Sequence, residues 1–187
     1  MSCCAAFFAS ASAADREGSP LFYQAPKSFY DPNRFELRGG VQTEFWGRES
    51  GIIGLSGELV FPRLFTIDRL PDFFTPRFQL GGVFNTAGRT SFVHADLLWT
   101  VNYTERIFGE MFAGVTVHDG RLDYSSWLHN ALGCRVLFHV GFNLGMRLDR
   151  NWSVIATYDH SSAGQALTRC PLNGSLNQSG VKLGYQF

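Results

Sequence analysis

His160 and Ser162 are the residues of this sequence whose types and spacing can carry out a reaction. They lie two positions apart in the segment WSVIATYDHSSAG, so in a β-strand both side chains point to the same face. An imidazole that takes the proton of a serine hydroxyl creates a nucleophile for an ester carbonyl. Because the spacing H-x-S arises often by chance, the alternative is that both are polar residues at an interface and have no catalytic role.

Three other histidines, His94, His118 and His139, share a face with the charged residues of their segments. A metal site needs several His, Cys or carboxylate ligands, and the sequence shows no closely spaced group of them. We therefore interpret these histidines as hydrogen-bonding residues and expect neither a metal nor another cofactor. The formal net charge of +0 also provides no basic surface for nucleic acid.

The segment that contains His160 and Ser162 is one of eight in which apolar and polar residues alternate. These segments cover residues 35–45, 52–61, 77–85, 93–103, 107–118, 138–148, 152–162 and 176–187. Alternation with a period of two is typical of strands that separate an apolar environment from a polar one. The pattern predicts an all-β protein, an eight-stranded antiparallel transmembrane β-barrel.

The two faces of these segments differ in charge. One face is aliphatic and aromatic, with aromatic residues near its ends: Trp46, Trp99, Tyr103, Trp152, Tyr158 and Tyr185. The other carries both signs of charge: Glu36, Arg38, Glu44, Glu58, Arg77, Asp96, Glu110, Arg147 and Lys182. Charges of mixed sign can pair inside a barrel but not against lipid, which favours a barrel in the bilayer of the bacterial outer membrane. A soluble lipocalin-like carrier, with its apolar face inside, is the alternative.

The N-terminal region is expected to lie outside the barrel. Residues 1–13, MSCCAAFFASASA, look like the later part of a secretory signal peptide, because a short apolar stretch ends in Ala-Ser-Ala. Residues 14–34 are rich in Pro, Ser and Asp and are expected to form an irregular lead-in, which leaves residues 35–187 for the barrel. Cys3 and Cys4 would be removed with the signal. The remaining pair, Cys134 and Cys170, predicts a disulfide in an exported protein.

The order of the segments places the candidate residues at one end of the barrel. With both termini on the periplasmic side, odd-numbered segments run toward the outer surface. His160 and Ser162 then end the seventh segment at that surface, and Asn177 begins the eighth beside them on the same face. Cys134 and Cys170 fall at the same end, which is consistent with the predicted disulfide.

Several of these stretches resemble one family. NALGCRVLF, WSVIATYDHSSAG, a later cysteine and the ending GVKLGYQF resemble the PagL-type lipid A 3-O-deacylases, as do SGELVFPR, FQLGGVFNTAG and DLLWTV. The resemblance implies an eight-stranded outer-membrane barrel that acts as an acyloxyacyl hydrolase. Its active site would face the lipid and contain a Ser-His-Glu triad. Its reaction is hydrolysis of the ester-linked acyl chain at position 3 of lipid A. The expected partner is therefore lipid A of lipopolysaccharide, and a homodimer is left open.

The resemblance assigns roles residue by residue. Ser162 matches the nucleophile, and His160 matches the base that takes its proton. Asn173 matches a loop asparagine of the family and is a candidate oxyanion donor, and Gly164 is a second candidate.

Two positions depart from the family pattern. Asn177 stands where the triad carboxylate is expected, and an amide can hold the tautomer of the histidine but cannot stabilise an imidazolium by charge. Ala163 stands where the family has an asparagine directly after the serine. These departures keep a second hypothesis open, a catalytically silent structural or lipid-binding barrel with the same fold.

Overall fold

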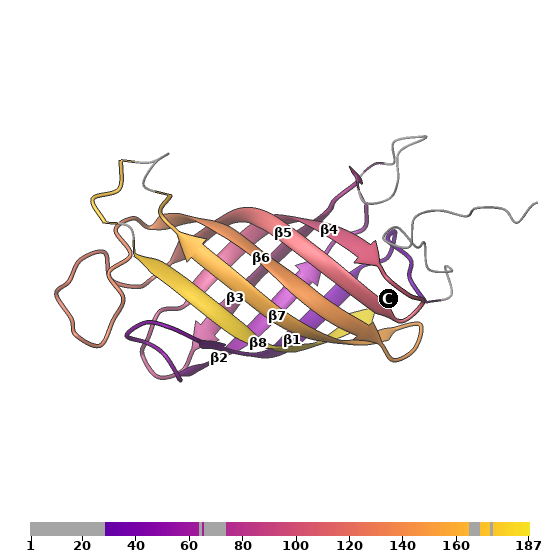
Figure 1. The fold of residues 1–187 in the computed structure, drawn as a ribbon, viewed down its shortest axis with the longest axis horizontal. Helices are drawn as coiled ribbons and strands as arrows, with labels where there is room; N and C mark the ends of the chain where they lie inside the picture. The colour runs from indigo at the N-terminus through magenta and orange to yellow at the C-terminus, as the bar shows by residue number, and fades with distance from the viewer. Residues whose placement is uncertain (1–28, 64, 66–73, 165–168, 173) are drawn as a thin grey trace, which may run out of the picture.

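A computed structural model of the protein describes residues 29–63, 65, 74–164, 169–172 and 174–187. Its strands are β1 (Glu36–Glu44), β2 (Ile53–Val60), β3 (Arg77–Asn85), β4 (Phe92–Asn102), β5 (Ile107–His118), β6 (Val136–Arg147), β7 (Trp152–Ser162) and β8 (Ser175–Gln186). Each strand pairs antiparallel with its neighbours in sequence, and β8 pairs with β1, so the sheet closes into a barrel (Figure 1). The predicted fold is confirmed. The predicted signal segment 1–13 and most of the lead-in 14–34 lie outside the described residues.

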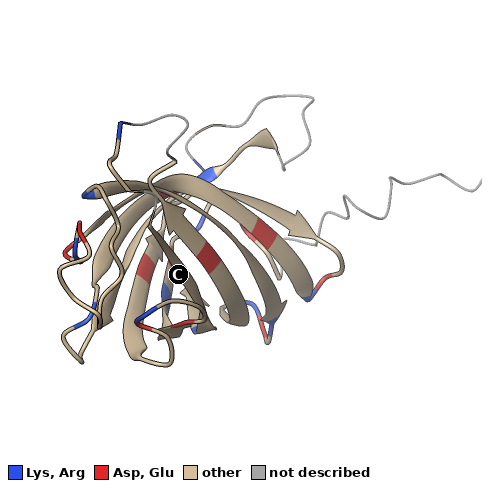
Figure 2. Cartoon of the chain, turned by 60° about the vertical axis from the view of Figure 1, so that its left-hand side comes forward, with Lys and Arg blue, Asp and Glu red and all other residues tan. Residues whose placement is uncertain are grey.

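The alternation of the sequence separates a charged interior from an apolar exterior. All the charged side chains predicted to face inward are buried: Glu36, Arg38, Glu44, Glu58, Arg77, Asp96, Glu110, Arg147 and Lys182. Figure 2 shows acidic positions within the strands as well as on the loops. The outward residues between them, such as Leu37, Leu55 and Phe142, are exposed. This arrangement is the reverse of the one a lipocalin-like carrier requires.

The buried charges are paired across the barrel interior. Arg38 donates two parallel hydrogen bonds to Glu110, at 2.7 and 2.8 Å, and a third to Glu36 at 2.9 Å. Arg77 binds the other oxygen of Glu36 at 3.2 Å, and Lys182 forms an ion pair with Glu58. A buried charge without such a partner would cost several kcal/mol, so these pairs make the charged interior tolerable.

The end of the barrel that is predicted to face outward, the outer end, is closed by an apolar cluster and a disulfide. The cluster contains Val83, Phe92, Leu132, Leu137, Ala163, Cys170 and Leu176. Cys134, just before β6, is bonded to Cys170 in the β7–β8 connection, with 5.7 Å between the Cα atoms. The predicted disulfide is confirmed, and it ties the connection that follows Ser162 to the start of β6.

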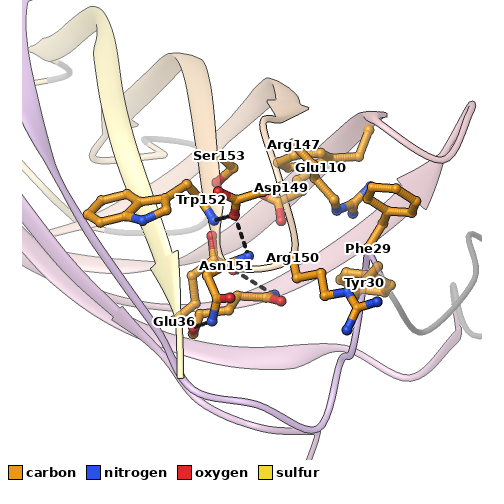
Figure 3. A pocket seen from close by; sticks show the side chains of 12 residues that line it. Phe29, Tyr30, Glu36, Glu110, Arg147, Asp149, Arg150, Asn151, Trp152 and Ser153 are labelled. Atoms are coloured by element: carbon orange, nitrogen blue, oxygen red, sulfur yellow. Dashed lines mark hydrogen bonds between the residues drawn. The ribbon is translucent and has the colours of Figure 1, made fainter.

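At the opposite end, Tyr30, which precedes β1, packs against Arg147 of β6 (Figure 3). The Arg147 guanidinium lies 4.6 Å from the centre of the Tyr30 ring and 4.3 Å from that of Phe108 in β5. A cavity of about 10 Å³ remains beside them, which is room for a single water. In the neighbouring turn, the backbone N–H groups of Trp152 and Asn151 donate to Asp149, which holds the pKa of this carboxyl below its ordinary value.

The described residues include no helix with the length and apolar character that a membrane crossing requires.

Candidate active site

β7 presents His160 and Ser162 on the outer wall of the barrel. Inward-facing Asp159 and Ser161 alternate with them and are buried, whereas His160 and Ser162 are half-buried. The structure places this pair on the outward face near the C-terminal end of β7, the face that the parity of the sequence predicted. The two side chains therefore lie on the apolar exterior of the barrel and not in its charged interior.

Asn177 of β8 lies directly opposite His160 in the β7–β8 ladder. Its Oδ1 is 2.8 Å from His160 Nδ1, so the amide oxygen accepts the Nδ1 proton. That hydrogen bond fixes the imidazole tautomer in which Nε2 carries a lone pair, which is the tautomer a general base needs. The sequence predicted that Asn177 lies beside His160, and the register between β7 and β8 brings these two residues into contact.

The orientation of the Asn177 amide is set by two further neighbours. The Tyr158 hydroxyl donates to Asn177 Oδ1 at 3.2 Å. Asn177 Nδ2 donates to Ser175 Oγ at 3.3 Å. Because the oxygen has donors on its side and the nitrogen has an acceptor, the amide turns its oxygen toward the imidazole. Sequence reasoning did not include Tyr158 or Ser175 in the site, although both share the outward parity of His160 and Asn177.

Ser162 completes the row at the outer end of the strand. It lies opposite Ser175 of β8 on one side and Phe138 of β6 on the other. Within the described part of the chain, no hydrogen bond joins Ser162 to His160. In hydrolases such a bond is often long before the substrate is bound and shortens in the complex.

The other residues assigned from the family resemblance have different surroundings. Gly164 follows β7 with a φ of +57°, a left-handed conformation that favours glycine, and a Cβ there would meet the Phe138 ring at 2.7 Å. Asn173 lies outside the described residues. Ala163 is fully buried in the apolar cluster at the outer end, so the departure at this position affects the interior and not the outward-facing row.

A hollow of about 320 Å³ adjoins the site at the outer end of the barrel, and Ser175 and Asn177 belong to its wall. The β1–β2 and β5–β6 loops contribute Trp46, Arg48, Tyr124 and Asn130. The Arg48 guanidinium lies 5.5 Å from the Tyr124 ring centre and 5.6 Å from that of Trp127. A cation flanked by aromatic rings can bind a phosphorylated sugar. This hollow could not be predicted from the sequence, because its residues are far apart along the chain.

In the barrel interior, His94 and His139 form a cluster with Asp96. Asp96 accepts hydrogen bonds from His94 Nδ1 at 2.6 Å and from His139 Nδ1 at 2.9 Å. The three residues offer ligand atoms within 4.8 Å of one another. Each imidazole donates its Nδ1 proton to the carboxylate, as the interpretation of these histidines as hydrogen-bonding residues expects. His139 Nε2 is buried 3.8 Å from Asp159 Oδ1 and makes no hydrogen bond in the part of the chain that the structure describes. Sequence spacing missed the cluster, because His139 comes from β6 and the other two residues from β4.

Solved structures share this architecture. The outer membrane enzyme PagL is 15% identical, with a TM-score of 0.56 over 79% of this chain and 97% of that one. The N-terminal β-barrel domain of Pseudomonas aeruginosa OprF is 13% identical, with a TM-score of 0.52 over 83% and 98%. A designed transmembrane β-barrel is 9% identical, with a TM-score of 0.53 over 85% and 99%. The chain has the fold of the eight-stranded outer-membrane barrels. Neither a family model nor a curated protein matches its sequence.

Proposed function

We propose that this protein is an outer-membrane esterase that hydrolyses the 3-O-linked acyl chain of lipid A. The observation that carries the proposal is the 2.8 Å contact between His160 Nδ1 and Asn177 Oδ1 on the lipid-facing wall, two residues from Ser162. A polar row of serine, histidine and amide on an otherwise apolar exterior has a desolvation cost, which a catalytic role explains.

The reaction follows the acyl-transfer scheme. Ser162 Oγ attacks the carbonyl carbon of the ester, and its proton passes to His160 Nε2. The tetrahedral intermediate collapses to an acyl-enzyme, and the departing sugar oxygen takes the proton from His160. A water then gives its proton to His160 and attacks the acyl-enzyme, which releases the fatty acid and restores Ser162. Gly164 and Asn173 are the proposed sources of oxyanion donors.

Asn177 is proposed as a positioning residue. Its amide oxygen holds the imidazole in the basic tautomer, as asparagine does in cysteine proteases of the papain type. Because the amide is neutral, it stabilises the transient imidazolium less than a carboxylate would. We therefore expect a slower enzyme than one with an acidic residue at this position.

The location of the row suits an ester of lipid A. His160, Ser162 and Asn177 lie at the end of the barrel where the Cys134–Cys170 disulfide is formed. In an outer membrane this end faces the outer leaflet, where the acyl esters of lipid A lie at the boundary between sugar and hydrocarbon. The neighbouring hollow with Arg48 can then accept the phosphorylated sugar while the acyl chain follows the apolar wall.

The test is expression in a bacterial outer membrane with fully acylated lipid A, followed by mass spectrometry of that lipid A. Wild type should remove one 3-hydroxyacyl chain, and Ser162→Ala should leave lipid A intact. Ser161→Ala is the matched control, because Ser161 is the adjacent serine and is fully buried on the inward face. Unchanged lipid A from correctly inserted wild-type protein would contradict the proposal.

A catalytically silent lipid-binding barrel is the second candidate. Two observations favour it: Asn177 lacks the charge of a triad carboxylate, and the described residues show no hydrogen bond between Ser162 and His160. It predicts a barrel with heat-modifiable mobility on gels and the same lipid A composition with and without the protein.

A further inference from the structure

The outward wall of β2 and β3 contains an apolar trough. Gly57 of β2 and Gly82 of β3 lie directly opposite each other in the ladder, between exposed Leu55 and Phe84 nearer the outer end and Leu59 and Leu80 below them. A Cβ built on Gly57 would meet no atom within 4 Å, so the surface there is open. The resulting hollow measures about 530 Å³, and its outward-facing wall includes Leu55, Gly57, Gly82, Phe84, Val93 and Val117.

A second hollow of about 560 Å³ lies at the outer end, between the β3–β4 and β5–β6 loops. Three arginines, Arg89, Arg121 and Arg135, belong to its wall. Arg135 Nη1 donates to the backbone oxygen of Gly120 at 2.7 Å, and Arg89 Nη1 donates to that of Leu128 at 2.8 Å, so both guanidinium groups are held in place. Arg89 Nε is buried and has no hydrogen-bond partner in the part of the chain that the structure describes.

The acidic residues of the second hollow are occupied by backbone groups. Asp119 accepts the N–H of Ser91 at 2.7 Å, and Asp123 accepts the N–H of Ser125 at 3.1 Å. Each carboxylate therefore stabilises a turn, and the arginines outnumber the two carboxylates. The hollow is suited to an anion with several oxygens, because guanidinium groups bind phosphate through paired N–H donors.

The two hollows are continuous. Phe84, Ser91 and Asp119 belong to the walls of both, so the apolar trough ends directly in the arginine-lined hollow. The combined surface offers a place for an acyl chain along the wall and for a phosphate at its outer end. It lies across the barrel from the candidate active site, because β3 is separated from β7 by β4, β5 and β6.

We propose that the β2–β5 wall binds one lipid A molecule of the outer leaflet as a retained, non-reacting lipid. Its phosphate lies among Arg89, Arg121 and Arg135, and one acyl chain lies in the trough over Gly57. Three features identify a phosphorylated, acylated lipid of that leaflet as the occupant. They are the positive charge of the second hollow, its position at the outer end and the apolar trough below it. The proposal depends on insertion in the outer membrane and not on hydrolysis at Ser162.

The test uses Ser162→Ala protein, which cannot consume the lipid, in detergent with lipid A that carries a photoreactive acyl chain. Cross-links mapped by peptide mass spectrometry should fall on residues 53–60, 77–93 and 117–121. Gly57→Leu fills the trough and should lower this labelling at least about tenfold. Arg121→Gln changes an exposed loop position and should lower it comparably, because a charge-assisted hydrogen bond is lost. Labelling near β7 and β8 should not change in either variant.

Matched controls separate this site from general lipid contact. Ala113→Leu enlarges an outward residue of β5 outside the trough, and Arg106→Gln removes an arginine at the opposite end; both should label as the parent does. Equal labelling around the whole barrel, or undiminished labelling in Gly57→Leu, would overturn the proposal. Equal labelling by dephosphorylated lipid A would also overturn it. If phosphatidylglycerol competed with the photoreactive lipid A as well as unlabelled lipid A does, the occupant would be a phospholipid and the proposal would be wrong.

Discussion

His160 Nδ1 and Asn177 Oδ1 are 2.8 Å apart, and the two residues are directly opposite in the β7–β8 ladder. Their contact is therefore fixed by strand pairing and not by the conformation of a loop. The Tyr158 hydroxyl donates to the same amide oxygen, which favours one orientation of the asparagine. The base of the proposed esterase thus has a fixed tautomer but lacks a charged partner.

Asn177→Asp should increase the rate of deacylation. A carboxylate at this position would accept the same Nδ1 proton and would also stabilise the imidazolium, for a gain on the order of tenfold or more in kcat. Asn177→Leu should lower kcat by a similar factor, because it leaves the tautomer unfixed. The measurement is the initial rate of fatty-acid release from lipid A in detergent. A faster Leu variant, or an inactive Asp variant that is still folded, would contradict the assigned role.

Arg48→Gln should weaken substrate binding without slowing the chemical step. Arg48 belongs to the hollow beside Asn177 and is exposed, so we expect KM to rise by roughly 3- to 10-fold with kcat unchanged. Steady-state kinetics with phosphorylated and dephosphorylated lipid A tests this, because the difference should vanish for the dephosphorylated form. Arg106→Gln, at the opposite end of the barrel, is the control. A fall in kcat at constant KM would assign Arg48 a different role.

Loss of the Cys134–Cys170 disulfide should destabilise the outer end. The bridge joins residues 36 positions apart, which corresponds to about 3–4 kcal/mol in the chain-entropy model. We expect the double variant Cys134→Ala, Cys170→Ala in lipid vesicles to unfold at a lower urea concentration. Its free energy of unfolding should be lower than that of the wild type by about 3–4 kcal/mol. Reduction of the wild type should give the same shift, and reduction of the double variant should give none.

Arg38→Gln should destabilise the barrel interior. The substitution leaves Glu110 without its bidentate partner and removes one of the two arginines that bind Glu36, at a cost of about 3–5 kcal/mol. Unfolding in urea followed by tryptophan fluorescence measures the change. Arg38→Met combined with Glu110→Gln should recover part of the loss, because no isolated carboxylate remains at position 110. An unchanged midpoint for Arg38→Gln would show that the bidentate pair contributes little.

Much of the architecture could be predicted from the sequence, because strand alternation has a period of two and a barrel wall separates two environments. Glu36, Arg38 and Lys182 could be assigned to one charged face on that basis, and the mixed signs of charge favoured the interior for that face. The structure buries all three. The outward face of His160 and Ser162 followed from the same parity. The roles of Asn173 and Gly164 as oxyanion donors remain predictions.

Contacts between distant strands could not be read from the sequence. The arginine-lined hollow joins Arg89 of the β3–β4 loop to Arg121 and Arg135 of the β5–β6 loop, and the trough below it joins Gly57 to Gly82. Period-two alternation places a side chain inside or outside, but it does not say which residues meet across a ladder. The sequence by itself therefore determined the strands and their two faces. Strand register and loop packing decided that Asn177 meets His160, that His94 and His139 share Asp96, and that two hollows adjoin the wall, because these contacts depend on closure of the barrel.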